Sequence, residues 1–168
     1  MKSWVKNADR KALWVLTVGK PMGNGHPVAA VMARRDLVDA FAASARYFNT
    51  FGGNTVSIAA AQATFDVLRD EGLQHNASVI GSHLLTGLRS LGHDTIRAAR
   101  GAGLFIGVEL EGGSDAAIAV VNEMRRRRVL IAASGVGNDI LKIRPPLPFS
   151  TDDADRLLEE LDGALAGL

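Results

Sequence analysis

Lys20 is the residue whose surroundings most favour covalent chemistry. It lies between Gly19 and Pro21, after an apolar run, and Gly23 and Gly25 follow it. Pro21 disfavours helical dihedral angles at Lys20, and the glycines leave space for a ligand beside the backbone. A lysine amine that is desolvated in such a pocket can act as a nucleophile toward a carbonyl group. A solvated lysine in an ordinary turn fits the same residues, and the local pattern by itself favours that simpler interpretation.

A second candidate site precedes a predicted helix, at Thr50-Phe51-Gly52-Gly53-Asn54. Asn54 is a good N-cap residue for the Ala-rich stretch that follows it. The threonine hydroxyl, the free backbone N–H groups and the helix dipole would together suit a phosphate group. A capped, glycine-bent connection without a ligand explains the same residues, and the motif alone favours it.

Two cations alternate late in the chain, where Lys142 and Arg144 precede Pro145-Pro146. The alternation predicts that both side chains lie on one face of a strand, where they could hold a carboxylate or a phosphate. The alternative is an exposed edge strand whose charges protect it from pairing with other chains.

Several other classes of site are excluded by the sequence. Pro21 follows Lys20, which breaks the P-loop pattern, and Gly101-Ala102-Gly103 lacks the third, helix-opening glycine of a dinucleotide-binding turn. The four histidines lack metal-ligand spacing and the chain has no cysteine, so we expect neither a metal site nor a disulfide. The cluster Arg125–Arg128 is interpreted as a solvated helix end.

The composition is that of a folded chain outside membranes. Of the 168 residues 47% are hydrophobic, and the formal net charge is +1. A charge this close to zero gives no electrostatic case for binding nucleic acid or an anionic membrane. No apolar run approaches the roughly 18 residues that a membrane-spanning helix needs. With the polar N-terminus and the lack of cysteine, these features predict a cytoplasmic protein.

The elements that would position the candidate residues change in character near residue 72. Before it, the patterns predict strands at 13–18 and 28–33, helices from 35 and over about 55–70, and non-helical segments at 19–27 and 47–54. After it, they predict a helix at 73–91, a strand at 104–110, a helix capped by Ser114, strands at 129–133 and 140–144, and a helix capped by Ser150. This second order predicts a compact α+β unit whose small sheet is covered by helices.

Four ordered segments resemble the signatures of class III aminotransferases, which are pyridoxal-phosphate enzymes of fold type I. They are Thr17–Pro27 around Lys20, then Tyr47–Asn54, Arg100–Glu109 and Leu141–Leu147. The resemblance is nearest to the subgroup of alanine–glyoxylate aminotransferase-like and phosphoethanolamine phospho-lyase-like proteins. It implies a mixed α/β to α+β chain, which is the C-terminal part of the pyridoxal-phosphate-dependent transferase fold.

The resemblance also implies roles for three residues. Lys20 matches the lysine that forms the internal aldimine with pyridoxal 5'-phosphate and then moves a proton between the substrate Cα and the cofactor C4′. Thr50 matches the residue that binds the cofactor phosphate across the interface of a homodimer. Lys142 lies where many members carry an arginine for the substrate carboxylate. A lysine lacks the bidentate fork of arginine, but its point charge would equally suit a phosphate.

In the family, the acidic partner of the pyridinium nitrogen and the main phosphate loop precede the lysine, whereas only 19 residues do so here. We therefore expect an unmatched leader at 1–12, a remnant of the large cofactor domain at 13–70 and the small C-terminal domain at 71–168. On this interpretation the chain is a truncated aminotransferase segment, weak or inactive alone. The full-length reaction would transfer an amino group from an amine or amino acid to a keto acid or aldehyde. A phospho-lyase acting on a phosphorylated amine and a non-catalytic dimerisation or interaction module stay open as alternatives.

Overall fold

The computed structural model describes residues 15–167. The predicted leader at 1–12 and the first two residues of the predicted strand at 13–18 lie outside this range. The chain divides after Gly72 into two compact parts. We call the described residues 15–72 the N-terminal unit and residues 73–167 the C-terminal unit.

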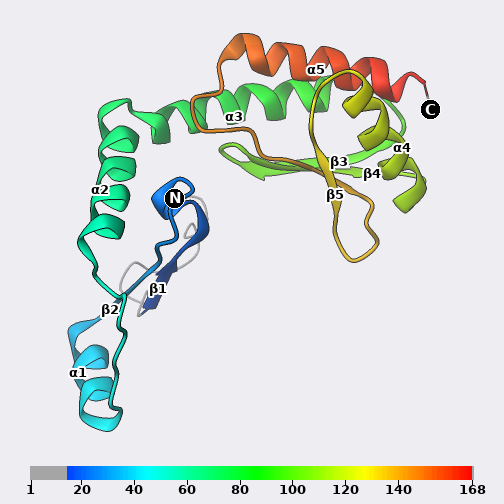
Figure 1. The fold of residues 1–168 in the computed structure, drawn as a ribbon. Coiled ribbons are helices and arrows are strands. Elements are labelled where there is room, and N and C mark those ends of the chain that lie inside the picture. Colours follow the sequence, from blue (N-terminus) through cyan, green and yellow to red (C-terminus); the bar gives the residue numbers. More distant parts are fainter. Residues whose placement is uncertain (1–14, 168) are drawn as a thin grey trace. The chain divides into compact units, whose positions relative to one another are not determined.

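The N-terminal unit contains a two-stranded ribbon and two α-helices (Figure 1). Strand β1 (Val15–Val18) pairs antiparallel with β2 (Ala30–Ala33), and α1 (Arg35–Ser44) and α2 (Thr55–Asp70) follow. These elements agree with the predicted strands and helices, although β2 begins two residues later than expected.

The prediction that residues 19–27 contain no helix is wrong. Lys20–Gly23 forms a single 3₁₀ turn, η2. Pro21 is compatible with this turn because the first residues of a helix have no N–H partner to lose. The turn ends at Asn24, which has a left-handed backbone (φ 47°) and donates its N–H to the Pro21 carbonyl at 3.0 Å.

The C-terminal unit is an antiparallel sheet with helices packed on one of its faces (Figure 1). In chain order its elements are α3 (Leu73–Ser90), β3 (Ile96–Ala102), β4 (Phe105–Leu110), α4 (Gly113–Arg126), β5 (Ala132–Ser134), β6 (Ile140–Ile143) and α5 (Thr151–Leu165). The strands lie in the order β3-β4-β6-β5, so β4 and β6 are central.

One apolar cluster joins the central strands to the three helices of this unit. Alternate residues of the two central strands are buried on the helix side: Ile106, Val108, Leu110, Leu141 and Ile143. The predicted stripe of α3 meets them through its buried leucines Leu84 and Leu88. Because period-2 strands and a period-3.6 helix supply one core, the patterns were sufficient to place it.

Strand β3 is missing from the predicted order of elements. Its residues Ile96 to Ala102 are mainly alanine, arginine and glycine, so they lack the large alternating apolar side chains that mark a strand. The pairing with β4 also shifts register between Ile96 and Ala98, which interrupts the alternation.

The predicted cap of α4 is also wrong. The helix begins at Gly113, and its N-cap is Gly112 with φ 84°, so Ser114 lies inside the first turn and caps nothing. The buried face of the helix consists of Ala117, Val120 and Met124, whereas Ile118 is 45% exposed. The predicted strand at 129–133 is likewise shorter and later, as β5 shows.

Candidate active site

Lys20 stands at the first position of η2, directly after β1 and Gly19. Its backbone has φ 50°, a left-handed conformation that L-residues with a side chain adopt rarely and at a cost of about 1–3 kcal/mol. Its side chain is exposed and makes no hydrogen bond or ion pair within residues 15–167. The amine is therefore accessible, and the packed burial that would rule out a nucleophilic role is not observed. The described residues do not, however, enclose Lys20 in the desolvated pocket that the sequence hypothesis expected.

The turn that carries Lys20 is closed by its own backbone. His26 donates its N–H to the Gly23 carbonyl at 3.0 Å, two residues after the bond that ends η2 at Asn24. Gly23 is buried, and a Cβ at this position would lie 2.7 Å from Val28 Cγ1 and 3.2 Å from His26 Cβ. Glycine is thus required at position 23, because the side chains of His26 and Val28 lie where a Cβ would be.

Thr50 lies in a turn that a second asparagine organises. Asn49 Oδ1 accepts hydrogen bonds from the N–H groups of Phe51 at 3.1 Å and Gly52 at 3.0 Å. Thr50 is exposed between these residues. Asn54 caps α2 as predicted, because its Oδ1 accepts the Ser57 N–H at 2.9 Å.

The lysine loop and the start of α2 are joined by polar side chains that the sequence did not single out. His26 Nε2 lies 2.8 Å from Ser57 Oγ, and Asn54 Nδ2 donates to the same Oγ at 2.9 Å. The Lys20 turn and the turn preceding α2 are therefore anchored at one helix end. A histidine inside a glycine-rich loop and a serine in the first turn of a helix are the signals that could have indicated this link.

Lys142 belongs to the C-terminal unit, on the central strand β6. It pairs with Gly107 on one side and Ala132 on the other, so small residues flank it on the face away from the helices. The alternative of an exposed edge strand is therefore wrong: β6 has neighbours on both sides, and the edges are β3 and β5. Arg144 lies on the same face with its guanidinium 5.6 Å from the Phe105 ring centre.

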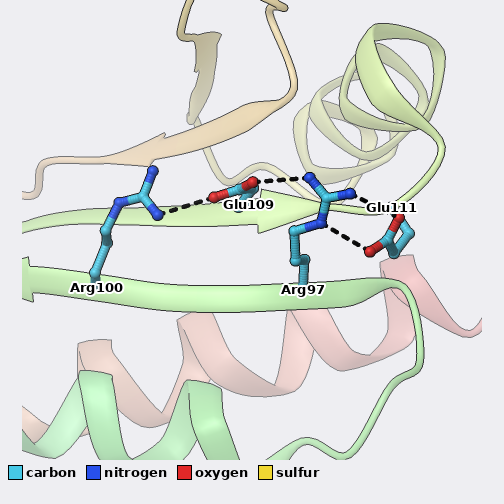
Figure 2. A network of polar contacts seen from close by, with 4 residues as sticks. All are labelled: Arg97, Arg100, Glu109 and Glu111. Atoms are coloured by element: carbon cyan, nitrogen blue, oxygen red, sulfur yellow. Dashed lines mark hydrogen bonds and ion pairs between the residues drawn. The ribbon is translucent and has the colours of Figure 1, made fainter.

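The acidic side chains on that face are already paired with arginines (Figure 2). Arg97 bonds both Glu109 at 3.0 Å and Glu111 at 2.8 Å, and Arg100 bonds Glu109 at 2.8 Å. The hydrogen bonds from Arg97 and then Arg100 hold the pKa of Glu109 below its usual value. Since Lys142 has no ion pair with any described residue, its charge remains available to an incoming anion.

Within residues 15–167 no group of three acidic or histidine side chains could hold a metal ion, and no helix is long and apolar enough to cross a membrane. A cavity of about 280 Å³ lies in the C-terminal unit between the β5 and β6 ends and α5. Its lining includes Ile143 and Arg144 but none of Lys20, Thr50 and Lys142. The cavity therefore does not coincide with any predicted site residue.

Comparison with known proteins decides the family. The model of the family described as aminotransferase class-III matches residues 8–165, which is nearly the whole chain. The chain belongs to the class III aminotransferases. The match begins at residue 8, inside the segment expected to be an unmatched leader.

Relatives of this class III chain include both aminotransferases and phospho-lyases. The alanine–glyoxylate aminotransferase 2-like protein of Drosophila melanogaster is 42% identical over 155 residues, covering 86% of this chain and 31% of that protein. Ethanolamine-phosphate phospho-lyase homolog 1 of Caenorhabditis elegans is 38% identical over 161 residues, covering 90% of this chain and 34% of that protein. The class III chain therefore spans about a third of the length of the curated relatives it matches.

Solved structures confirm the predicted fold class. An Arthrobacter phospholyase in complex with phosphoethanolamine is 37% identical with a TM-score of 0.89, covering 92% of this chain and 39% of that one. Class III membership implies pyridoxal phosphate as the cofactor. The described residues fit it at one point: the Lys20 amine is accessible and unpaired within residues 15–167, so none of them blocks its reaction with an aldehyde.

Proposed function

We propose that the chain is the part of a pyridoxal-phosphate-dependent enzyme that supplies the cofactor-holding lysine, Lys20. The observation that carries the proposal is the free amine of Lys20 in a strained, closed turn, within a chain that matches the family from residue 8 to residue 165. The full-length reaction is the transfer of an amino group from an amine or amino acid to a keto acid or aldehyde.

In this proposal Lys20 has two tasks. Its amine holds the cofactor covalently, and after substrate has displaced it the same amine moves a proton at the substrate Cα. When bound, pyridoxal phosphate supplies an electron sink for the carbanion that this proton transfer leaves. The turn of η2 keeps the amine at the end of β1, so the reacting nitrogen is placed by backbone rather than by side-chain contacts.

Thr50 would bind the cofactor phosphate of the partner subunit in a homodimer. Three aromatic side chains beside it support an interface at this turn, because Tyr47, Phe48 and Phe51 are 70%, 83% and 78% exposed. Exposed apolar groups gathered in one segment are typical of a surface that another chain covers. The turn would thus bring the hydroxyl and its neighbours to the partner together.

Lys142 would bind the anionic end of the substrate. Its place on the open face, flanked by Gly107 and Ala132, leaves room for a carboxylate or phosphate beside the amine. The lysine favours a tetrahedral phosphate as well as a planar carboxylate, because it is a point charge without a fork. For this reason a phospho-lyase acting on a phosphorylated amine is the second candidate function, and the phospho-lyases among the relatives support it.

The chain by itself is proposed to have little or no activity. Among the described residues of the N-terminal unit only Gly23 and Ser57 are buried, so this unit has no apolar core of its own. That agrees with residues 13–70 being the remnant of a large cofactor domain and 71–168 the small domain. A non-catalytic dimerisation module would use the same exposed surface, and the cytoplasmic location stays a prediction.

The direct experiment is the absorbance of the 168-residue chain mixed with pyridoxal phosphate. A Schiff-base band is expected in the wild type and in Lys142→Ala, and Lys20→Ala should lose the part of it that depends on Lys20. The absence of any band that depends on Lys20 would remove the enzyme function for this chain.

Two further measurements separate the alternatives. Release of inorganic phosphate from phosphoethanolamine without transamination would favour the phospho-lyase. Sedimentation that shows the same dimer with and without cofactor, in a chain that gives no Schiff-base band, would favour the interaction module.

A further inference from the structure

Ser57 is an unusual residue in the N-terminal unit. It is 9% exposed, and it is the one buried polar residue in the part of the chain that the structure describes. A buried hydroxyl costs free energy unless it is hydrogen-bonded. Here the hydroxyl has two partners, Asn54 Nδ2 at 2.9 Å and His26 Nε2 at 2.8 Å.

The hydrogen bonds around Ser57 leave little freedom to the side chains that make them. Asn54 donates through Nδ2 to Ser57 Oγ and to the Phe51 carbonyl at 2.8 Å, and its Oδ1 accepts the Ser57 N–H. Both ends of the amide are therefore engaged. Ser57 Oγ still has its own proton and a lone pair for a second hydrogen bond. That bond is made with His26, which is 31 residues away in the sequence.

His26 transmits this contact to the Lys20 turn. Its N–H is bonded to the Gly23 carbonyl, and its Cβ is one of the two groups that leave no space at Gly23. A displacement of His26 would thus open the turn that gives Lys20 its left-handed backbone. Because the unit has no apolar core to hold the loop, this polar contact carries a larger share of its order than it would in a packed domain.

We propose that His26 and Ser57 are positioning residues for Lys20, and that their hydrogen bond fixes the lysine turn to the helix end that also carries the Thr50 turn. The proposal rests on the proposed function of Lys20. It concerns residues of this chain alone, and neither His26 nor Ser57 needs to touch the cofactor. Ser57 then acts as the common anchor of the two segments expected to serve cofactor binding.

The test compares four single variants of the 168-residue chain and the double variant Ser57→Ala/His26→Phe. Ser57→Ala removes the hydroxyl and with it the bonds to His26 and Asn54. His26→Phe keeps a ring without nitrogen, and His26→Gln retains a polar group at the place of Nε2. His75→Phe is the matched control, since His75 is exposed on α3 and makes no hydrogen bond to the described residues. Far-UV circular dichroism checks that each variant folds. If a histidine variant does not fold, Ser57→Ala alone tests whether the hydrogen bond fixes the turn.

The first readout is amide hydrogen exchange at Asn24 and His26, whose N–H groups close the turn. Loss of the hydrogen bond between His26 and Ser57, which both variants share, predicts an increase of about five- to tenfold in Ser57→Ala and in His26→Phe. His26→Gln should return to within about twofold of the wild type, and His75→Phe should not differ from it. Adding His26→Phe to Ser57→Ala should cause no further increase, because the hydrogen bond between these two residues is already lost.

The second readout is the part of the Schiff-base absorbance that depends on Lys20, taken as the difference from the same variant carrying Lys20→Ala. We expect its rate of formation to fall by a similar factor in Ser57→Ala and His26→Phe, with rescue by His26→Gln. Wild-type exchange and wild-type rates in both variants would overturn the proposal, as would additive effects in the double variant. If the wild type shows no Lys20-dependent band, the proposed function fails, whereas the exchange measurement still decides whether the contact fixes the turn.

Discussion

At the scale of single residues, the lysine to which we assign the chemistry lies in a strained segment of backbone. Lys20 and Asn24 both have positive φ within one short loop, and Gly23 between them cannot accept a Cβ. The sequence indicated Lys20 because its glycine and proline neighbours are adjacent to it in the chain. It did not indicate His26 and Ser57, because their contact joins residues 31 apart and no local pattern encodes a tertiary hydrogen bond.

A close backbone contact in the C-terminal unit gives the first stability prediction. Gly81 is buried on α3, and a Cβ there would collide with the Gly103 backbone, which cannot move as a side chain can. Gly81→Ala should lower the free energy of unfolding by about 1–3 kcal/mol, although alanine is the better helix former. Urea denaturation measures this, with the adjacent exposed position Ser82→Ala as control. Equal stability of Gly81→Ala and the wild type would show that α3 does not closely approach the Gly103 backbone.

The paired glutamate on the open face predicts how stability changes with pH. Because hydrogen bonds from Arg97 and Arg100 lower the pKa of Glu109 in the folded chain, the folded state holds its proton more weakly than the unfolded state. The resulting stabilisation is present above the unfolded pKa of about 4.3 and is lost as the pH falls through the lower folded pKa. The pKa values of Glu123, beside Arg126 and Arg127, and of Asp153, beside Ser150, are lowered in the same direction.

The urea midpoint should therefore fall between about pH 5 and pH 3, and it should fall less steeply in Glu109→Gln, which cannot titrate. The control is Glu159→Gln, an exposed residue of α5 without an ion pair to the described residues. An identical pH dependence in Glu109→Gln and the wild type would contradict the role assigned to the arginines.

At the scale of elements, strong amphipathic patterns and caps were predictable, whereas elements defined by their neighbours were not. Helix α5 follows Ser150 as predicted, with the reciprocal bonds of a capping box between Ser150 and Asp153. Strand β3 escaped prediction because pairing with β4, rather than its own apolar residues, makes it a strand. The central place of β6 was equally hidden, since charges at Lys142 and Arg144 resemble those of an edge.

The cap of α5 yields a prediction at this scale. Ser150→Ala removes the acceptor of the Asp153 N–H bond and should cost about 1 kcal/mol of unfolding free energy in the C-terminal unit. Ser150→Asn should lose much less, because asparagine also caps helices well. Thermal unfolding followed by circular dichroism distinguishes the two. If both variants were as stable as the wild type, the capping box would not contribute to this helix.

At the scale of the whole molecule, the two units differ in how they are held together. The C-terminal unit has a continuous apolar core, whereas the N-terminal unit exposes large apolar side chains, among them Val31, Phe48 and Phe65. The family and fold class followed from four ordered motifs, and the comparisons confirm both. Lys20 and Lys142 belong to different units, and no local sequence pattern relates residues of separate units.

Borohydride trapping can identify the lysine that carries the cofactor. The chain has five lysines, at positions 2, 6, 11, 20 and 142. The chain is mixed with pyridoxal phosphate, reduced with borohydride and mapped by peptide mass spectrometry. We expect a pyridoxyl group predominantly on Lys20, with less preference for Lys20 when pyridoxal without its phosphate is used. Label spread evenly over the five lysines, or absent from Lys20, would contradict it.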